Sequence, residues 1–143
     1  MKKSAFIILI SLLSLASFAQ NNIQKQKFHF GREQDTTAGY AQAVKVDNVL
    51  YISGTVGGGP DAAAALKQIY SNIERTLKHY GATFQNVVKE NLYTTDIEAV
   101  KQNNHVRKAF YKGDFPAATW VQITRLFMQQ ATIEVEVIAH LPK

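Results

Sequence analysis

Apolar side chains recur at steps of three and four residues between residues 60 and 81. The set comprises Ala62, Leu66, Ile69, Tyr70, Ile73, Leu77 and Tyr80. This spacing is typical of an amphipathic helix with one buried face. Pro60 and Asp61 stand where such a helix begins, and Gly81 stands where it ends. The pattern therefore predicts one long helix that packs against the rest of the chain.

Six other segments are rich in β-branched and aromatic residues, or alternate between apolar and polar side chains, as strands do. They span residues 28–30, 44–46, 50–53, 87–95, 118–126 and 131–140. Asp47 and Asn48 separate the second segment from the third, and both residue types tolerate the backbone of a tight hairpin turn. Asp96 is a suitable N-cap for a second helix, which we expect to end near Lys112. Residues 31–39 follow neither period and are expected to form a loop.

The order of these elements predicts the fold class. A short strand and a hairpin come first, then a helix, a strand, the second helix and two final strands. This order predicts an α+β domain of two layers, in which a mixed six-stranded sheet carries both helices on one face. The other face is left uncovered. Because several strands carry apolar residues on both faces, we expect the uncovered face to take part in oligomerisation.

The composition agrees with a single globular domain. Of the 143 residues, 46% are hydrophobic and 19% are charged, which excludes collagen-like and disordered chains. The absence of cysteine excludes a disulfide framework, a thiolate nucleophile and a lipoprotein anchor. A domain of this length buries about two-thirds of its unfolded surface, so it needs no structural metal.

Residues 1–19 have the pattern of a secretory signal peptide. Lys2 and Lys3 form a positive start, residues 5–15 form an apolar run, and Ala19 ends a small-residue cleavage site. The run is shorter than the ~20 residues of a membrane span, which argues against an uncleaved anchor. We therefore expect a mature single domain at residues 20–143, periplasmic or secreted, without membrane attachment after cleavage.

Charge and motifs exclude several function classes. The net charge of +5 includes the two lysines of the leader, and no run of Lys or Arg predicts a nucleic-acid partner. The glycines at 57–59 lack the Lys-Ser/Thr ending of a phosphate loop, and no Gly-x-Ser-x-Gly elbow indicates a serine hydrolase. The histidines lie far apart, without metal-ligand spacing, so we predict no metal site. They are His29, His79, His105 and His140.

Several short motifs follow one another along the chain. They are Gly39-Tyr40-Ala41-Gln42-Ala43-Val44, Leu50-Tyr51-Ile52-Ser53-Gly54, Val87-Val88-Lys89, Tyr93-Thr94-Thr95-Asp96, Asn104, Phe110, Phe115-Pro116-Ala117 and Ile133-Glu134-Val135-Glu136-Val137-Ile138-Ala139. In order and approximate spacing, the series resembles the reactive intermediate deaminase family, known as Rid or YjgF. The resemblance covers nearly all of the chain from Phe28 to His140.

The resemblance implies both an assembly and an activity. Members of this family are similar to chorismate mutase in fold and form homotrimers with a ligand pocket at each subunit interface. The best-known members hydrolyse 2-imino or enamine acids to 2-keto acids and ammonia, and they need no cofactor. We therefore expect a homotrimer that binds a small molecule and uses no cofactor.

The resemblance also assigns pocket roles to single residues. Tyr40, Ser53, Gly54 and Asn104 match ligand-binding positions. Glu134 matches the family's pocket glutamate, which is thought to position or activate water. Structural alternatives stay open: Tyr40 could pack in the core or an interface, Ser53 could bond to nearby backbone, and Glu134 could share a solvated acidic face with Glu136. Asparagine inside a helix is locally unfavourable, which favours a specific role for Asn104.

The arginine that binds the substrate carboxylate in the family is missing. Its place directly after Pro116-Ala117 is taken by Ala118, and the next two pocket positions are Thr119 and Trp120. An unpaired carboxylate in a closed pocket costs about 2–5 kcal/mol of binding free energy. Trp120 either forms an aromatic wall of the pocket or packs in the core.

Other arginines do not obviously replace the missing one. Arg125 is expected to face solvent or to form a salt bridge. Arg32 or Arg107 could enter from a neighbouring subunit, although nothing in the sequence favours this.

Three functions agree with these observations. The first is a Rid-type hydrolase that acts on an imine, enamine or related C–N bond of a substrate without an α-carboxylate, with Glu134 guiding water. The second is a trimeric module that binds a small metabolite without chemistry, for which Ala118 and Trp120 argue. The third, RNA cleavage, ranks last because the chain has no basic stripe and is expected to be exported.

Overall fold

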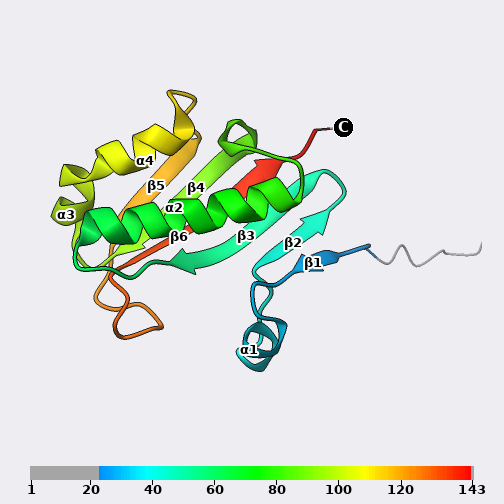
Figure 1. Ribbon diagram of the computed structural model, residues 1–143, viewed down its shortest axis with the longest axis horizontal. Coiled ribbons are helices and arrows are strands. Elements are labelled where there is room, and N and C mark those ends of the chain that lie inside the picture. The colour runs from blue at the N-terminus through cyan, green and yellow to red at the C-terminus, as the bar shows by residue number, and fades with distance from the viewer. Residues whose placement is uncertain (1–22, 143) are drawn as a thin grey trace, which may run out of the picture.

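The computed structural model describes residues 23–142, so the predicted signal peptide at 1–19 lies outside the described residues. Two layers are visible in Figure 1, a twisted sheet and a layer of helices in front of it. The elements are β1 (Gln26–Phe28), α1 (Arg32–Thr37), β2 (Ala43–Val46), β3 (Val49–Val56), α2 (Ala62–His79), the 3₁₀ helix η1 (Phe84–Asn86), β4 (Val87–Thr94), α3 (Ile97–Gln102), α4 (Asn104–Tyr111), β5 (Ala117–Gln122) and β6 (Ile133–His140).

The six strands form one sheet in the order β1-β2-β3-β6-β4-β5. Neighbouring strands are antiparallel except β4 and β5, which are parallel. Helices α2, α3 and α4 lie on the same side of this sheet (Figure 1). The predicted α+β class and the mixed six-stranded sheet are therefore confirmed.

Local sequence signals set the helix ends. The Asp61 side chain accepts a 2.8 Å hydrogen bond from the Ala64 backbone N–H at the start of α2, and Gly81 follows its end with a φ of 69°. Asp96 caps α3 in the same way, through a 3.0 Å bond from the Ala99 N–H. The apolar face of α2 and the helix-facing side chains of the central strands form the core, which includes Leu66, Ile69, Tyr70, Ile73, Leu77, Leu50, Leu92, Val135 and Val137.

Three local predictions differ most from the structure, and in addition the first strand spans Gln26–Phe28 rather than 28–30. Residues 32–37 form the short helix α1 instead of a loop, because the buried Asp35 binds His29 at 3.1 Å and fixes a turn that has no apolar period. The second helix is divided into α3 and α4 at Asn103, whose Nδ2 donates to the Ala99 carbonyl at 2.9 Å and competes for a helix acceptor. β5 ends at Gln122, and the chain then leaves the sheet as a loop.

The open face of the sheet is mixed rather than apolar. Glu136 on this face accepts hydrogen bonds from Asn91 Nδ2 at 2.8 Å and from the Tyr93 hydroxyl at 3.1 Å. Tyr51 is exposed on the same face and lines a shallow hollow with Glu136. Within residues 23–142, no helix is long and apolar enough to span a membrane.

Candidate functional site

A β-bulge in β3 shapes the candidate site. Ile52 pairs with Val137 and Thr55 pairs with Val135, so β3 carries one more residue than β6 between these pairs. The extra residue lies in the Ser53-Gly54 segment. A bulge bends its strand and redirects nearby side chains, and here it brings Ser53 and Gly54 beside Glu134 of β6.

Gly54 is required by the close approach of Glu134. A Cβ atom built on Gly54 would overlap the Oε1 atom of the Glu134 carboxyl group. Only glycine lets a side chain from the neighbouring strand lie this close to the backbone. Gly54 and Glu134 therefore form one unit.

A cavity of about 360 Å³ lies over this unit. Its walls include Tyr40 from the segment before β2, Ser53 and Gly54 from the bulge, and Glu134 from β6. Phe127 and Met128 reach it from the loop between β5 and β6, and the Phe127 side chain is 91% exposed. The cavity thus combines one carboxylate with aromatic and apolar surface.

Glu134 is the titratable group best suited to acid–base chemistry in this cavity. Burial raises the pKa of its carboxyl group above the ordinary value of 4.5, and the charge of Glu136 raises it further. Within residues 23–142, no group donates a hydrogen bond to Glu134, whereas Glu136 has two donors. A desolvated carboxylate with a raised pKa and free lone pairs can accept and return a proton near neutral pH.

Tyr40 and Ser53 are held by their own segment. The Ser53 hydroxyl donates to the Ala41 carbonyl at 2.7 Å, so the backbone-bonding alternative for this residue is correct, and Ser53 also lines the cavity. Burial raises the pKa of the Tyr40 hydroxyl, and hydrogen bonding to Asp35 and the charge of Asp35 add to the effect. Tyr40 is 45% exposed, which leaves its ring open to a ligand rather than packed in the core.

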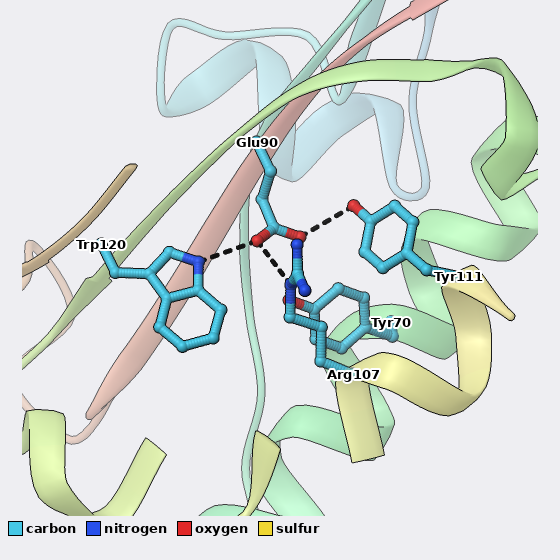
Figure 2. A network of polar contacts seen from close by, with 5 residues as sticks. All are labelled: Tyr70, Glu90, Arg107, Tyr111 and Trp120. Atoms are coloured by element: carbon cyan, nitrogen blue, oxygen red, sulfur yellow. Dashed lines mark hydrogen bonds and ion pairs between the residues drawn. The ribbon is translucent and has the colours of Figure 1, made fainter. Parts of the chain in front are cut away.

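A second region lies on the other side of the sheet, around a buried glutamate of β4. Glu90 is 0% exposed. Figure 2 shows the side chains of Tyr70, Arg107, Tyr111 and Trp120 around its carboxylate. Its Oε1 atom accepts from Arg107 Nε at 2.8 Å and from the Trp120 indole N–H at 3.0 Å. Its Oε2 atom accepts from the hydroxyls of Tyr70 at 3.0 Å and Tyr111 at 2.7 Å.

This network joins both layers of the fold. Tyr70 comes from α2, Arg107 and Tyr111 from α4, and Trp120 from β5. Burial and the Glu90 charge raise the pKa values of both tyrosines well above the ordinary range, so both hydroxyls stay protonated and act as donors. A buried carboxylate needs such saturation, because an unpaired charge in the interior is costly.

Within residues 23–142, no three His, Cys, Asp or Glu side chains lie close enough together to hold a metal ion.

Comparison with known proteins assigns the chain to a family. Residues 31–141 match the family described as Endoribonuclease L-PSP. Human 2-iminobutanoate/2-iminopropanoate deaminase is 35% identical over 108 residues, which are 70% of this chain and 78% of that protein. A crystal structure of a YjgF/YER057c/UK114 family member from Mycobacterium tuberculosis is 28% identical, with a TM-score of 0.76, and the match covers 82% of this chain and all of that one. A protein of the Rid family from Yersinia pestis is 29% identical, with a TM-score of 0.68, over 72% of this chain and 88% of its own.

The chain belongs to the Rid family. The structure divides the predicted Rid site residues into two groups. Four of them line the cavity together, namely Tyr40, Ser53, Gly54 and Glu134. The other four lie on β5 and at the start of α4, and none of them lines that cavity in the single chain.

The second group has varied surroundings. Ala118 is exposed and pairs with Glu90 across β4 and β5. The Thr119 hydroxyl accepts from Lys89 Nζ at 2.8 Å on the open face. Trp120 is half-buried against the core, as the packing alternative predicts, and its N–H is used by Glu90. Asn104 is half-buried, and its Oδ1 atom is buried with no hydrogen-bond partner within residues 23–142.

The arginines that stood as candidates for the missing Rid arginine have clear positions. Arg107 is 6% exposed and is held by Glu90 of its own chain. Arg125 is exposed, as expected. Arg32 is exposed at the start of α1.

Sequence reasoning missed two features of this Rid domain. Phe127 and Met128 come directly after the strand predicted at 118–126, and no local pattern indicates that their side chains reach the Glu134 cavity. Glu90 did carry a signal, since it stands in phase with the buried Leu92 in a strand of period two. A charged residue at such a position needs partners, although its four partners are scattered along the sequence.

Proposed function

We propose that this protein is a Rid-type hydrolase that cleaves an imine, enamine or related C–N bond of a small metabolite. The observation that carries the proposal is the cavity in which Glu134, with a raised pKa and no donor, meets Tyr40 and the Ser53-Gly54 bulge. Membership of the Rid family and the deaminase name of the human relative support the reaction class.

The reaction follows from what Glu134 can do. Its carboxylate accepts a proton from a water molecule, and the water oxygen forms a bond to the imine carbon. The same proton is then returned to the nitrogen, which gives a carbinolamine. Glu134 next carries the proton of the carbinolamine hydroxyl to the amino nitrogen, the C–N bond breaks, and ammonia leaves as the carbonyl forms. General acid–base catalysis of this kind contributes about 10²–10⁴-fold in rate. Tyr40, Phe127 and Met128 would bind the apolar part of the substrate.

A neighbouring copy of the chain would complete the pocket. Five of the six residues of β5 are exposed, and β5 is an edge strand, which is the type of surface that another chain covers. The proposed homotrimer would place Asn104 and the Ala118–Thr119–Trp120 segment of one chain against the Glu134 cavity of the next. A monomer in sedimentation or light-scattering measurements would contradict this part of the proposal.

Ala118 argues for a substrate without an α-carboxylate. Among residues 23–142, no arginine lines the Glu134 cavity, and Arg107, which lies near the β5 edge, already forms an ion pair with Glu90. A carboxylate there would lack the bidentate partner that makes such binding strong. The proposed export through a signal peptide at 1–19 also separates this protein from cytoplasmic sources of 2-imino acids.

Hydrolysis of 2-iminopropanoate, generated in situ, tests the proposal with the mature protein. Turnover by the wild type that Glu134→Ala removes would support a Glu134-dependent hydrolase. Turnover only after Ala118→Arg would support an intact site whose natural substrate lacks the carboxylate. Normal turnover by Glu134→Ala would reject the role of Glu134.

A second candidate function is a trimeric module that binds a metabolite without chemistry. Ala118 favours it, since alanine offers a substrate no charged partner, and the indole N–H of Trp120 is already bound to Glu90. Loss of turnover in Glu134→Gln, with the ligand still bound, would reject this candidate.

A further inference from the structure

A second cavity, which we call the basic groove, adjoins the candidate site. It encloses about 680 Å³ between the open face of β1 and β2 and the helix α1. Its charged lining residues are Lys25, Lys27 and Arg32, and His29 lies among them. Lys27 faces Val44 across the β1–β2 pair, which sets both residues in the floor of the groove.

The positive charges of the basic groove are uncompensated. Within residues 23–142, no ion pair or side-chain hydrogen bond engages Lys25, Lys27 or Arg32. Asp35, behind the groove, is 5% exposed and accepts from His29 Nδ1 at 3.1 Å. In the part of the chain that the structure describes, no aspartate or glutamate lines the groove. Three free cations around one depression favour an oxyanion ligand.

His29 adds a side chain of fixed orientation to the groove, beside the cations of Lys25, Lys27 and Arg32. Its side chain is 13% exposed, and that of Asp35 is 7% exposed, so the pair is almost fully packed. Because Nδ1 is directed at Asp35, Nε2 is the ring nitrogen that remains for a ligand. A second-layer carboxylate of this kind fixes the orientation of an imidazole.

Tyr40 connects the basic groove to the Glu134 cavity. It is the one residue, among those described, that lines both cavities. Its hydroxyl lies close enough to Asp35 for that carboxylate to affect it, and Asp35 in turn holds His29. A molecule that extends from Glu134 past the Tyr40 ring therefore enters the groove.

We propose that the basic groove binds an acidic group, a phosphate or a carboxylate, of the molecule whose reacting centre lies beside Glu134. This inference rests on the proposed function only for the position of the reacting centre beside Glu134. The proposed substrate is therefore a small compound with a C–N bond beside Glu134 and an oxyanion group that lies away from the β5 edge. Arg32 supplies a planar fork for two oxygens, and Lys25 and Lys27 supply point charges.

Titration of the protein with inorganic phosphate tests the groove without any need for turnover. Amide signals of Lys27, Gly39 and Ala41 should shift with saturation in NMR spectra, and the affinity should fall about tenfold in Arg32→Gln at low salt. Lys45→Gln is the matched control, because Lys45 lies on β2 but outside the groove, and it should leave the affinity unchanged. No saturable shift at these amides, or equal losses in both variants, would overturn the inference.

A pair of substrates then joins the groove to the reaction. 5-Iminohexanoate ends in a carboxylate and hexan-2-imine ends in a methyl group, and neither carries an α-carboxylate. The wild type should prefer the first in kcat/KM by about tenfold, mainly through KM, and Lys27→Gln or Arg32→Gln should remove the preference. Hydrolysis of both compounds without preference would overturn the groove and leave the proposed function standing. Hydrolysis of neither would count against the proposed function, and the phosphate titration would then decide the groove by itself.

A nucleic acid is the competing oxyanion ligand. A single-stranded RNA oligomer that binds far more tightly than phosphate, with affinity falling steeply in salt and unaffected by Tyr40→Ala, would overturn the small-molecule assignment.

Discussion

Glu90 and Glu134 stand on the neighbouring strands β4 and β6, yet their surroundings are opposite. Glu90 faces the helices, is fully buried and accepts four hydrogen bonds. Glu134 faces a cavity on the open side and accepts none within residues 23–142. The first carboxylate is saturated and serves to hold α2, α4 and β5 together. The second keeps its lone pairs and has a raised pKa, which is what an acid–base group requires.

Glu90 also holds the exposed edge strand β5 in place. β5 is an edge strand whose residues are exposed except for Trp120, so it has little apolar anchorage of its own. The indole N–H of Trp120 ties β5 to Glu90, and through Glu90 to two helices. A rigid β5 is in turn needed if a neighbouring chain is to present it to a ligand pocket.

The largest expected effect is a difference in the free energy of unfolding between the Glu90→Ala and Glu134→Ala variants. Glu90→Ala removes the partner of a buried arginine and two buried tyrosines, so the free energy of unfolding should fall by about 3–5 kcal/mol. Glu134→Ala removes a carboxylate without donors and should change it by less than about 1 kcal/mol. Urea denaturation of both variants measures the difference. Equal losses would contradict the assignment of separate roles.

A smaller loss should follow the removal of one donor. Tyr111→Phe deletes the hydroxyl that binds Glu90 at 2.7 Å, and a hydrogen bond to a charged group contributes about 1.5–3 kcal/mol. Tyr80→Phe is the matched control, because the Tyr80 hydroxyl has no hydrogen-bond partner within residues 23–142, unlike those of Tyr70, Tyr93 and Tyr111. Thermal unfolding should therefore shift for Tyr111→Phe and stay near the wild-type value for Tyr80→Phe. The reverse order would show that the network adds no stability.

The pH dependence of turnover should move with Glu136. In the proposed reaction the active form of Glu134 is the carboxylate, so kcat/KM should fall as pH decreases through its pKa, with a midpoint above 4.5. Glu136→Gln removes a charge that raises this pKa, and the midpoint should shift to lower pH. Glu98→Gln, an exposed change on α3, is the control and should leave the midpoint in place. An unchanged midpoint in Glu136→Gln would mean that another group controls the rate.

The smallest expected effect is on stability at neutral pH. Because the folded pKa of Glu134 lies above its unfolded value, folding favours the protonated form. This stabilisation is present below the unfolded pKa and is lost as pH rises through the folded pKa. Glu134→Gln removes the penalty of the charged form, so it should be slightly more stable than the wild type at neutral pH, and this gain should disappear in acid. Denaturation curves at both pH values check the sign.

Much of the fold could be predicted from local pattern. The long helix α2 has an apolar period, an N-cap in Asp61 and a terminating glycine in Gly81, and all three signals agree. The alternation in β6 placed Glu134 and Glu136 together on one face. Helix α1 could not be predicted, because a buried carboxylate rather than an apolar stripe holds its turn, through the contact between Asp35 and His29.

The candidate site was predictable only in part, because several of its contacts form only when distant segments of the chain pack together. The resemblance to the Rid family gave Tyr40, Ser53, Gly54 and Glu134, because each stands in one of the short motifs that carry the resemblance. The partners of Glu90 come from four elements and meet only after the layers have packed. Phe127 and Met128 depend on the path of a loop, which no periodicity constrains.

The most direct test of the account is the hydrolysis rate of Glu134→Gln, measured with its unfolding curve on the same preparation and with a substrate that the wild type turns over. The account predicts a loss of about 10²–10⁴-fold in kcat/KM, together with a stability at least equal to that of the wild type. A variant that is folded and retains wild-type kcat/KM would contradict the claim that the carboxylate without donors performs the acid–base step.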